Sequence, residues 1–198
     1  GIIRGVTNVY YGAGSALAGL LQSRSDVRGV TQTPAYDARL RVATNVYSGA
    51  KFAPDLGPGS KQYKWLEHYL ARAKEMTWRF GVLHHPLYST GAHPPTEELV
   101  KTLEPLFLKY KVDLVFEGHD HDYERTKPVK EGMPDEKEGI VYVTLGGGGQ
   151  ALYFQRANED WSEKFLPVYH FARVEVKEKN LVMNVYNKDG QVIDTFGI

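Results

Sequence analysis

Hydrophobic and polar positions follow two different periods along this chain. Between residues 60 and 110, apolar side chains recur every three or four positions, which is the spacing of one helix face. Short apolar runs lie between and after these stretches. From residue 168, apolar and polar positions alternate, as they do in a half-buried strand. The pattern predicts an α/β region followed by an antiparallel β region.

Two helices are predicted in the first region. Ser60 is a suitable N-cap for the first helix. The apolar stripe of that helix consists of Tyr63, Leu66, Tyr69, Leu70 and Ala73. Thr96 can cap the second helix, and Glu97 and Glu98 suit its positive N-terminal end. Pro105 lies inside this second pattern and predicts either a kink or two shorter helices.

Strands are predicted where short apolar runs occur without helical spacing. These runs cover residues 79–84, 112–116 and 140–145. An antiparallel meander follows from residue 168, with turns at Lys179–Asn180 and Asp189–Gly190.

The N-terminal part of the chain is less regular. A short helix is expected over residues 13–21 and a strand over residues 40–47. Gly57–Pro58–Gly59 marks a break after them. We therefore expect residues 1–56 to form an N-terminal segment of the same domain, and residues 57–198 to form its main part.

Composition narrows the class of protein. The chain has 198 residues, enough for one domain with a sizeable core, and its 24 basic and 24 acidic residues give zero net charge. This balance argues against nucleic acid or an anionic membrane as a partner. Cysteine is absent, which excludes thiol catalysis and disulfides. No apolar run reaches 18 residues, so no transmembrane helix is expected.

Histidines gather where the predicted strands end. Four of the seven lie there: His84, His85, His119 and His121. Histidine is the commonest protein ligand of metals. In the sequence Gly118–His119–Asp120–His121, two imidazoles one residue apart can each reach a separate metal ion, and Gly118 permits a sharp turn. The alternative is a solvated turn with two incidental histidines.

The other histidines carry less information. His84 follows a buried strand directly, and its alternative is a core histidine. Because side chains alternate along a strand, we expect His85 on the opposite face, so that only one of the pair binds metal. His93 lies in a proline-flanked loop, where simple exposure is the alternative. His68 fits a helix surface, and His170 fits a structural place in the meander.

Four glycines, residues 146–149, follow the strand at 140–145. A phosphate-binding loop is disfavoured because neither Gly-Lys-Ser/Thr nor a predicted helix follows them. Two interpretations remain open. The glycines allow a close backbone approach to the metal site, or they form a flexible connector.

Taken in order, these motifs resemble the calcineurin-like metallophosphoesterases, most closely their purple-acid-phosphatase-like branch. The resemblance covers about residues 57 to 198 and is carried by SKQYKWL from residue 60, VLHHPLYS from 82, and VDLVF and GHDHDYERT from 112 and 118. It implies an αββα sandwich with metals at the strand ends. This chain would supply an incomplete sandwich, its C-terminal half, with the antiparallel meander.

The resemblance also implies roles for individual residues. His84 and His119 correspond to ligands of one metal ion, and His121 to a ligand of the other. His93 corresponds to a histidine that contacts phosphate and protonates the leaving group, and His85 falls beside the substrate. The segment that follows the ligands, residues 123–125, corresponds to a support for them. The complete enzyme would use two divalent or trivalent ions (Fe, Zn or Mn) to hydrolyse a small-molecule phosphate ester.

Part of the family pattern is absent. The chain contains no Gly-Asp pair and no Gly-Asn-His, the motifs that supply the bridging carboxylate and other ligands. Two divalent cations about 3.5 Å apart repel by roughly 19 kcal/mol at an effective dielectric of about 20, and neutral imidazoles do not offset that repulsion. We therefore expect partial or no metal occupancy in these 198 residues alone.

Three explanations for the absence remain open. The chain is the C-terminal part of a longer enzyme, which we favour, or it is a degenerate member of the family. In the third, Asp26, Asp37 or Asp55 substitutes for the lost ligands. The expected function is metal-dependent phosphoester hydrolysis, and its alternative is an inactive binding or scaffold module on the same fold. An incomplete sandwich exposes apolar surface, so we expect self-association or a missing N-terminal segment.

Overall fold

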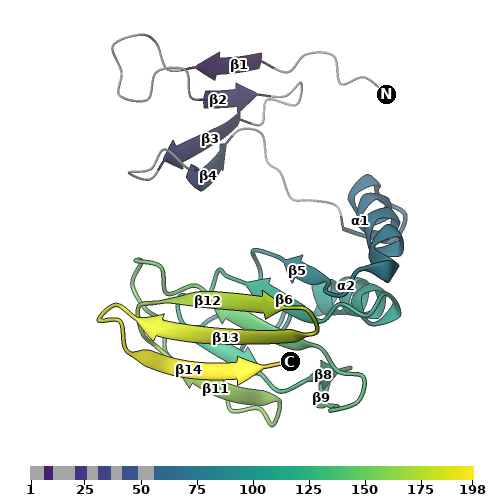
Figure 1. The fold of residues 1–198 in the computed structure, drawn as a ribbon, viewed down its shortest axis with the longest axis vertical. Helices are drawn as coiled ribbons and strands as arrows, with labels where there is room; N and C mark the ends of the chain where they lie inside the picture. The colour runs from purple at the N-terminus through teal and green to yellow at the C-terminus, as the bar shows by residue number, and fades with distance from the viewer. Residues whose placement is uncertain (1–6, 11–20, 26–30, 37–41, 49–55) are drawn as a thin grey trace. The chain divides into compact units, whose positions relative to one another are not determined.

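The structure, a computed structural model, describes residues 56–198 and, before them, the backbone of four strands. The chain divides into two compact units, Gly1–Pro54 and Asp55–Ile198. In the first unit, four strands pair antiparallel in chain order (Figure 1): β1 (Thr7–Tyr10), β2 (Leu21–Ser25), β3 (Thr31–Tyr36) and β4 (Val42–Ser48).

This first unit confirms one of the predicted elements, the strand, and does not test the predicted helix. The strand expected over residues 40–47 is β4, whereas β1, β2 and β3 were not predicted. Residues 13–20 of the expected short helix lie outside the described residues, and Leu21 begins β2. That residues 1–56 belong to the same domain as the rest stays a prediction.

The second unit is built on a mixed five-stranded sheet in the order β11-β7-β10-β6-β5. Its strands are β5 (Phe80–Val82), β6 (Leu114–Glu117), β7 (Tyr123–Thr126), β10 (Val141–Leu145) and β11 (Ser162–Leu166). β6 runs parallel to both β5 and β10, while β7 is antiparallel to β10 and β11. The three predicted strands at residues 79–84, 112–116 and 140–145 are therefore neighbours, so their C-terminal ends meet at one edge of the sheet.

The predicted meander forms a second sheet. It comprises β12 (His170–Lys177), β13 (Asn180–Asn187) and β14 (Val192–Gly197), paired antiparallel. Both predicted turns join these strands. A small ribbon of β8 (Val129–Lys130) and β9 (Met133–Pro134) lies apart from the two sheets.

Two helices and a 3₁₀ turn complete the unit. They are α1 (Lys61–Arg72), η1 (Ala73–Glu75) and α2 (Glu97–Lys109). Ser60 caps α1 as predicted, since its hydroxyl accepts a hydrogen bond from the Tyr63 amide at 3.1 Å. Thr96 precedes α2, but its side chain makes no capping bond.

Of the two outcomes predicted for Pro105, two shorter helices are wrong, because α2 continues through it, and a kink stays a prediction. A proline inside a helix costs about 3 kcal/mol. Three side chains beside it, Leu103, Leu106 and Phe107, are buried in the core. Each contributes about 1.5–3 kcal/mol, so their burial outweighs the cost of the proline.

The five-stranded sheet is covered on both faces. On one face, Leu87, Leu103 and Phe107 pack with residues of both helices against Val115 and Tyr142. On the other face, the meander residues Leu181, Met183 and Val185 pack against Leu114, Tyr123 and Val143. Figure 1 shows the meander lying over this sheet. The described layers are thus helix, sheet and sheet, an α/β arrangement with an antiparallel C-terminal sheet, as the resemblance implies. Among the described residues, no helix is both long and apolar enough to cross a membrane.

Candidate metal centre

The site lies at the C-terminal ends of the parallel strands β5 and β6. After β5, the Leu83 amide donates to the Phe116 carbonyl at 2.9 Å, and the Gly118 amide donates to the His84 carbonyl at 3.1 Å. These two bonds continue the pairing of the strands past their ends, so that the bend at His84 lies beside the turn at His119. His119 has a φ of 66°, in the left-handed region that non-glycine residues rarely adopt.

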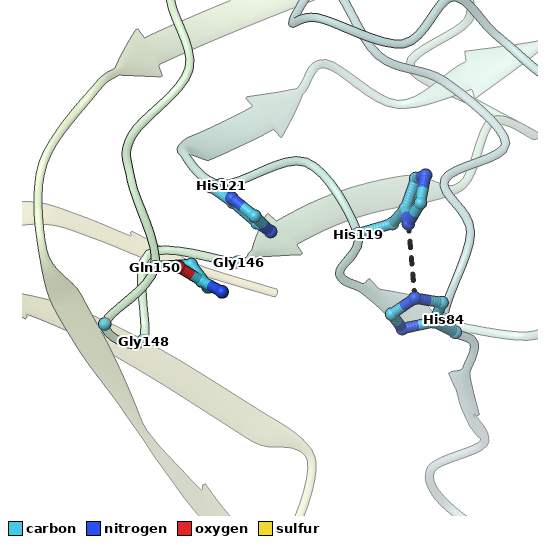
Figure 2. A pocket seen from close by; sticks show the side chains of 7 residues that line it. His84, His119, His121, Gly146, Gly148 and Gln150 are labelled. Atoms are coloured by element: carbon cyan, nitrogen blue, oxygen red, sulfur yellow. Dashed lines mark hydrogen bonds between the residues drawn. The ribbon is translucent and has the colours of Figure 1, made fainter. Parts of the chain in front are cut away.

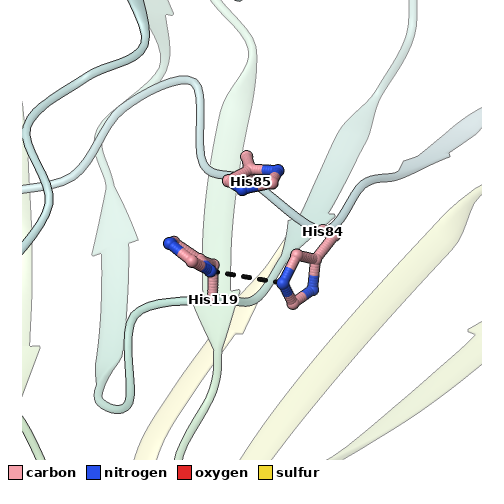
Figure 3. Close-up of side chains that lie close together, drawn as sticks. All are labelled: His84, His85 and His119. Atoms are coloured by element: carbon pink, nitrogen blue, oxygen red, sulfur yellow. Dashed lines mark hydrogen bonds between the residues drawn. The ribbon is translucent and has the colours of Figure 1, made fainter. Parts of the chain in front are cut away.

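Three imidazoles meet at these strand ends. The His119 Nδ1 and His84 Nε2 atoms are 3.2 Å apart, and the His85 ring lies 4.9 Å from that of His84 and 4.4 Å from that of His119. Figure 3 shows the three rings facing a common space. One ligand nitrogen from each lies within 4.8 Å of the others. Among the described residues, this is the one group of three or more metal-binding side chains this close together.

The expectation that His85 points away from His84 is wrong. It assumed that the strand continues through both residues, whereas β5 ends at Val82 and the histidines lie in the following bend. Alternation of side chains does not hold outside an extended strand.

His121 lines a pocket together with His84 and His119. The pocket has a volume of about 480 Å³ and is lined by His84, His119, His121, Gly146, Gly148, Gly149 and Gln150. His121 Nδ1 donates to the Ala151 carbonyl at 2.8 Å, and the ring stacks on Tyr153 at 4.3 Å. Since a carbonyl only accepts, Nε2 of His121 carries the free lone pair. Figure 2 shows His121 apart from the His84–His119 pair.

His93 approaches from the loop after β5. Its ring lies 4.4 Å from that of His119, and its Nδ1 bonds the carboxylate of Asp120. Asp120 is fully buried and also accepts bonds from the Ser89 hydroxyl and, at 3.2 Å, from the His93 amide. The loop carrying His93 is therefore fixed to the turn that carries the other histidines.

Further buried carboxylates lie beneath the histidines. Among the described residues, both carboxylate oxygens of Asp122 lack a hydrogen-bond partner. Burial, together with the nearby charges of Asp120 and Glu124, raises the pKa of Asp122 to about 8. Glu124 accepts bonds from Thr90 and Ser162. Burial also raises the pKa of Glu124. With a pKa near 8, the Asp122 side chain is largely protonated at neutral pH and adds little negative charge to the site.

Burial and neighbouring imidazoles favour the neutral forms of His84 and His119. Burial, followed by the neighbouring His85 and His121, lowers the pKa of His84. Burial and the neighbouring imidazoles of His85, His93 and His84 likewise lower the pKa of His119. Neutral imidazole is the form that binds metal. The residues present therefore fit a metal ion in donor type and spacing.

The glycine run passes close to this turn. A Cβ atom on Gly146 would lie 1.7 Å from the Asp120 carbonyl oxygen and 3.3 Å from the His121 Cα. Gly148, in contrast, has open space around it. At Gly146 the structure thus favours a close backbone approach, whereas a connector fits Gly148.

The structure brings together His84, His85, His119, His93 and His121, and the roles assigned to them stay predictions. Sequence reasoning missed Asp120 and Tyr153. Asp120 lies inside the histidine motif, and its position between two candidate ligands was the available signal. Tyr153 follows the glycine run in a segment without periodicity, so nothing in the sequence indicated it.

Two sequence proposals about supporting and substitute ligands have different outcomes. Of residues 123–125, only Glu124 bonds the site loops, while Tyr123 and Arg125 bond Asp194 in the meander. The substitute carboxylates named from the sequence, Asp26, Asp37 and Asp55, lie outside the described residues.

Comparison with known proteins bears on the family of the chain. The family model for calcineurin-like phosphoesterase matches residues 27–123. Probable purple acid phosphatase 20 from Arabidopsis thaliana is 43% identical over 101 residues, which cover 48% of this chain and 23% of that protein. Probable inactive purple acid phosphatase 24 from the same plant is 33% identical over 165 residues, 73% of this chain and 27% of that protein.

A solved structure has a similar fold. The purple acid phosphatase isolated from yellow lupin (Lupinus luteus) seeds superposes with a TM-score of 0.63 at 29% identity, over 71% of this chain and 28% of that one. The chain spans about a quarter of the length of the curated relatives that it matches. In sequence over these regions and in fold, it is similar to the calcineurin-like metallophosphoesterases, in the branch that contains the purple acid phosphatases.

Proposed function

We propose that this chain carries the histidine half of a metal-dependent phosphoester hydrolase centre. The proposal rests on the meeting of His84 and His119, from two parallel strand ends, with ligand nitrogens 3.2 Å apart. In the complete enzyme these two residues would hold one ion and His121, across the pocket, would hold the second. The ions would be Fe, Zn or Mn, since imidazole suits borderline and transition metals.

Bound metal would lower the pKa of a water molecule and polarise the phosphoryl oxygens of the substrate. The chain's own residues would do the rest. His93 Nδ1 donates to the buried Asp120 carboxylate, which leaves Nε2 to carry a proton to the departing alcohol oxygen. His85, at the rim of the cluster, would contact the substrate.

The pocket suits a small phosphate ester. Its volume of about 480 Å³ is at the lower end of the usual range for ligand pockets, and glycines form much of one wall. The three histidines of its lining present nitrogen atoms to a phosphate group. A small-molecule monoester or diester is thus the proposed substrate class.

The test is turnover of p-nitrophenyl phosphate by metal-depleted protein after addition of Zn²⁺, Mn²⁺ or Fe³⁺. We expect His119→Ala to lower kcat/KM at least about 100-fold, since removing one ligand disrupts the metal site. His68→Ala changes a helix histidine outside the cluster and is the matched control. Absence of both bound metal and turnover in the parent protein would contradict the proposal.

A catalytically inactive binding module is the second candidate. Among the described residues, no carboxylate shares the histidine cluster, and one relative is itself named as probably inactive. Metal binding without turnover in the same experiment would favour this second function.

A further inference from the structure

A second pocket lies along helix α2. It has a volume of about 520 Å³, within the usual range for small-molecule sites. The turn between β8 and β9 contributes Glu131 and Gly132 to its lining. The helix contributes a continuous stripe of five residues: Glu97, Val100, Lys101, Glu104 and Pro105. This pocket shares no lining residue with the histidine pocket, so it is a separate cavity.

Glu104 places a buried carboxylate in the wall of this α2 pocket. The residue is 3% exposed, and its Oε1 accepts bonds from the Tyr88 hydroxyl at 2.9 Å and from the Glu131 amide at 3.2 Å. All three residues line the pocket. Among the described residues, no hydrogen bond reaches Glu104 Oε2, and this atom is not fully enclosed. Oε2 is therefore an acceptor that a ligand in the pocket can satisfy.

Pro105 leaves a second acceptor on the same wall. In an α-helix, the amide of residue 105 would donate to the carbonyl of Lys101, but proline has no amide hydrogen. The Lys101 carbonyl therefore lacks its usual helical donor, and both residues line the pocket. An alkyl ammonium group carries three N–H donors, which suits a wall with two free acceptors.

The rest of the lining favours a cation with an apolar body. Three carboxylates and one ammonium group line the pocket, and that ammonium, on Lys101, already pairs with Glu97 at 2.9 Å. Burial raises the pKa of Glu104, and a bound cation would oppose that shift. Pro95 and Val100 supply apolar surface. We propose that this pocket binds a small molecule with a primary ammonium group and an apolar body, held by the Glu104 carboxylate.

Phenethylamine, which is cationic at neutral pH, is the probe, and phenethyl alcohol is its uncharged counterpart of similar shape. Each is titrated into the isotope-labelled full chain while NMR follows the amides of Glu131 and Gly132. We expect saturable shifts of both amides with the amine. The alcohol should bind at least about tenfold more weakly, since hydrogen bonds between charged groups are the strong ones. Equal affinity for the two probes, or the absence of a saturable shift, would overturn the proposal.

Glu104→Gln tests the carboxylate directly. Glutamine keeps an acceptor oxygen for Tyr88 and for the Glu131 amide but carries no charge. Affinity for the amine should fall at least about tenfold, while affinity for the alcohol should change less than about threefold. An unchanged affinity for the amine would contradict the role given to Glu104.

Pro105→Ala separates a binding effect from a folding defect. Alanine restores the amide that donates to the Lys101 carbonyl, so the helix should become more stable in urea. The same bond occupies one of the two acceptors, and affinity for the amine should fall about threefold or more. Weaker binding in a more stable protein has no explanation in misfolding, whereas unchanged binding would show that the carbonyl has no part in the site.

Lys101→Ala should have the opposite effect on binding. It removes the one cation from the lining, so affinity for the amine should rise about two- to fivefold. Lys109→Ala removes the same charge from the same helix, outside the lining, and should leave the affinity unchanged. Equal effects of the two changes would show that net charge attracts the amine, and would overturn the proposal. No measurement here involves metal or turnover, so the result is independent of the proposed function.

Discussion

At the scale of single residues, Asp120 connects the two loops that form the site. It stands between His119 and His121 in the sequence, and its carboxylate bonds Ser89 and His93 in the loop after β5. A fully buried carboxylate is costly unless its oxygens are bonded, and here the loop after β5 supplies the donors. The same bonds orient the His93 ring, so the position of one candidate catalytic group depends on a residue of the metal-binding turn.

Gly146 is the residue at which a small substitution should have a large effect. In Gly146→Ala the new methyl would meet the Asp120 carbonyl oxygen at 1.7 Å, so the turn carrying His119 and His121 must shift. Overpacking of this kind costs about 1–3 kcal/mol. We expect urea denaturation to show that loss, and Zn²⁺ titration to show binding weakened at least about tenfold.

Gly148→Ala is the matched control for this change. It adds the same methyl to the same glycine run, in open space on the pocket wall. Stability and zinc affinity should stay close to those of the parent. Equal losses in the two variants would show that the run needs glycine for its backbone freedom and not for the close approach at Gly146.

Sequence reasoning at this scale found the histidines and missed their surroundings. His84, His119 and His121 follow apolar runs, so strand ends could be recognised from the pattern. The direction of His85 was predicted wrongly because β5 stops two residues before His84. The contact of His93 with Asp120 joins two loops. Loop conformations have no regular hydrophobic period, so this contact could not be predicted from the sequence.

At the scale of elements, Asp194 joins the two sheets of the second unit. It lies on β14 and accepts bonds from Tyr123 at 2.6 Å, Arg125 at 2.8 Å and Lys164 at 3.3 Å, which belong to β7 and β11. Although burial alone would raise it, bonds from Arg125 and Tyr123 lower the pKa of Asp194 to about 2. One carboxylate thus fixes the meander to the sheet that carries the site.

This arrangement predicts a pH dependence of stability. The folded-state pKa of Asp194 lies below its unfolded-state value, so its contribution is fully present above about pH 4 and is lost as the pH falls toward 2. The contribution is roughly 2 kcal/mol. We expect urea denaturation to show Asp194→Asn less stable than the parent by about that amount at pH 7, with a smaller difference at pH 2.5.

Asp189→Asn is the control for the pH experiment. Asp189 is an exposed carboxylate in the turn between β13 and β14, and its ion pair with Lys188 lies at the surface. Exposed pairs contribute little, so this change should alter stability by less than about 0.5 kcal/mol at either pH. A difference for Asp194→Asn that does not change with pH would contradict the role given to its charge.

The elements that could be predicted from the sequence are those with a strong pattern of hydrophobic and polar positions. Both helices and the meander have clear periods, the three parallel strands are short apolar runs, and the structure contains all of them. β1, β2 and β3 are rich in polar residues, and β3 includes Pro34, so neither alternation nor an apolar run marks them. Pro105 led to the opposite error, since two shorter helices were among the predictions and one continuous helix is present. The burial of neighbouring side chains outweighs the local cost of the proline.

At the scale of the whole molecule, β5 and β11 are the two edge strands of the main sheet in the second unit, and the β5 edge carries exposed apolar side chains. Among the described strands, β5 has a hydrogen-bonded neighbour on one side only. Its outer residues Phe80 and Val82 are exposed, Val82 at 77%. On α1, Trp65 and Tyr69 are also exposed, with rings 5.2 Å apart. An open strand edge with apolar side chains favours association with a further strand.

We therefore expect the chain to self-associate through the β5 edge as its concentration rises. Light scattering coupled to size-exclusion chromatography should show a mass above that of one chain. Val82→Lys should restore the monomer, because a charged side chain opposes pairing at a strand edge.

Met76→Lys is the control. It removes an apolar side chain that is 60% exposed in a loop after η1, and it should leave association unchanged. If the two variants behave alike, association is a general effect of exposed apolar surface, and the β5 edge has no special part in it. A parent protein that stays monomeric at every concentration would show that β5 needs no partner strand, and the incomplete sandwich would then be stable as it stands.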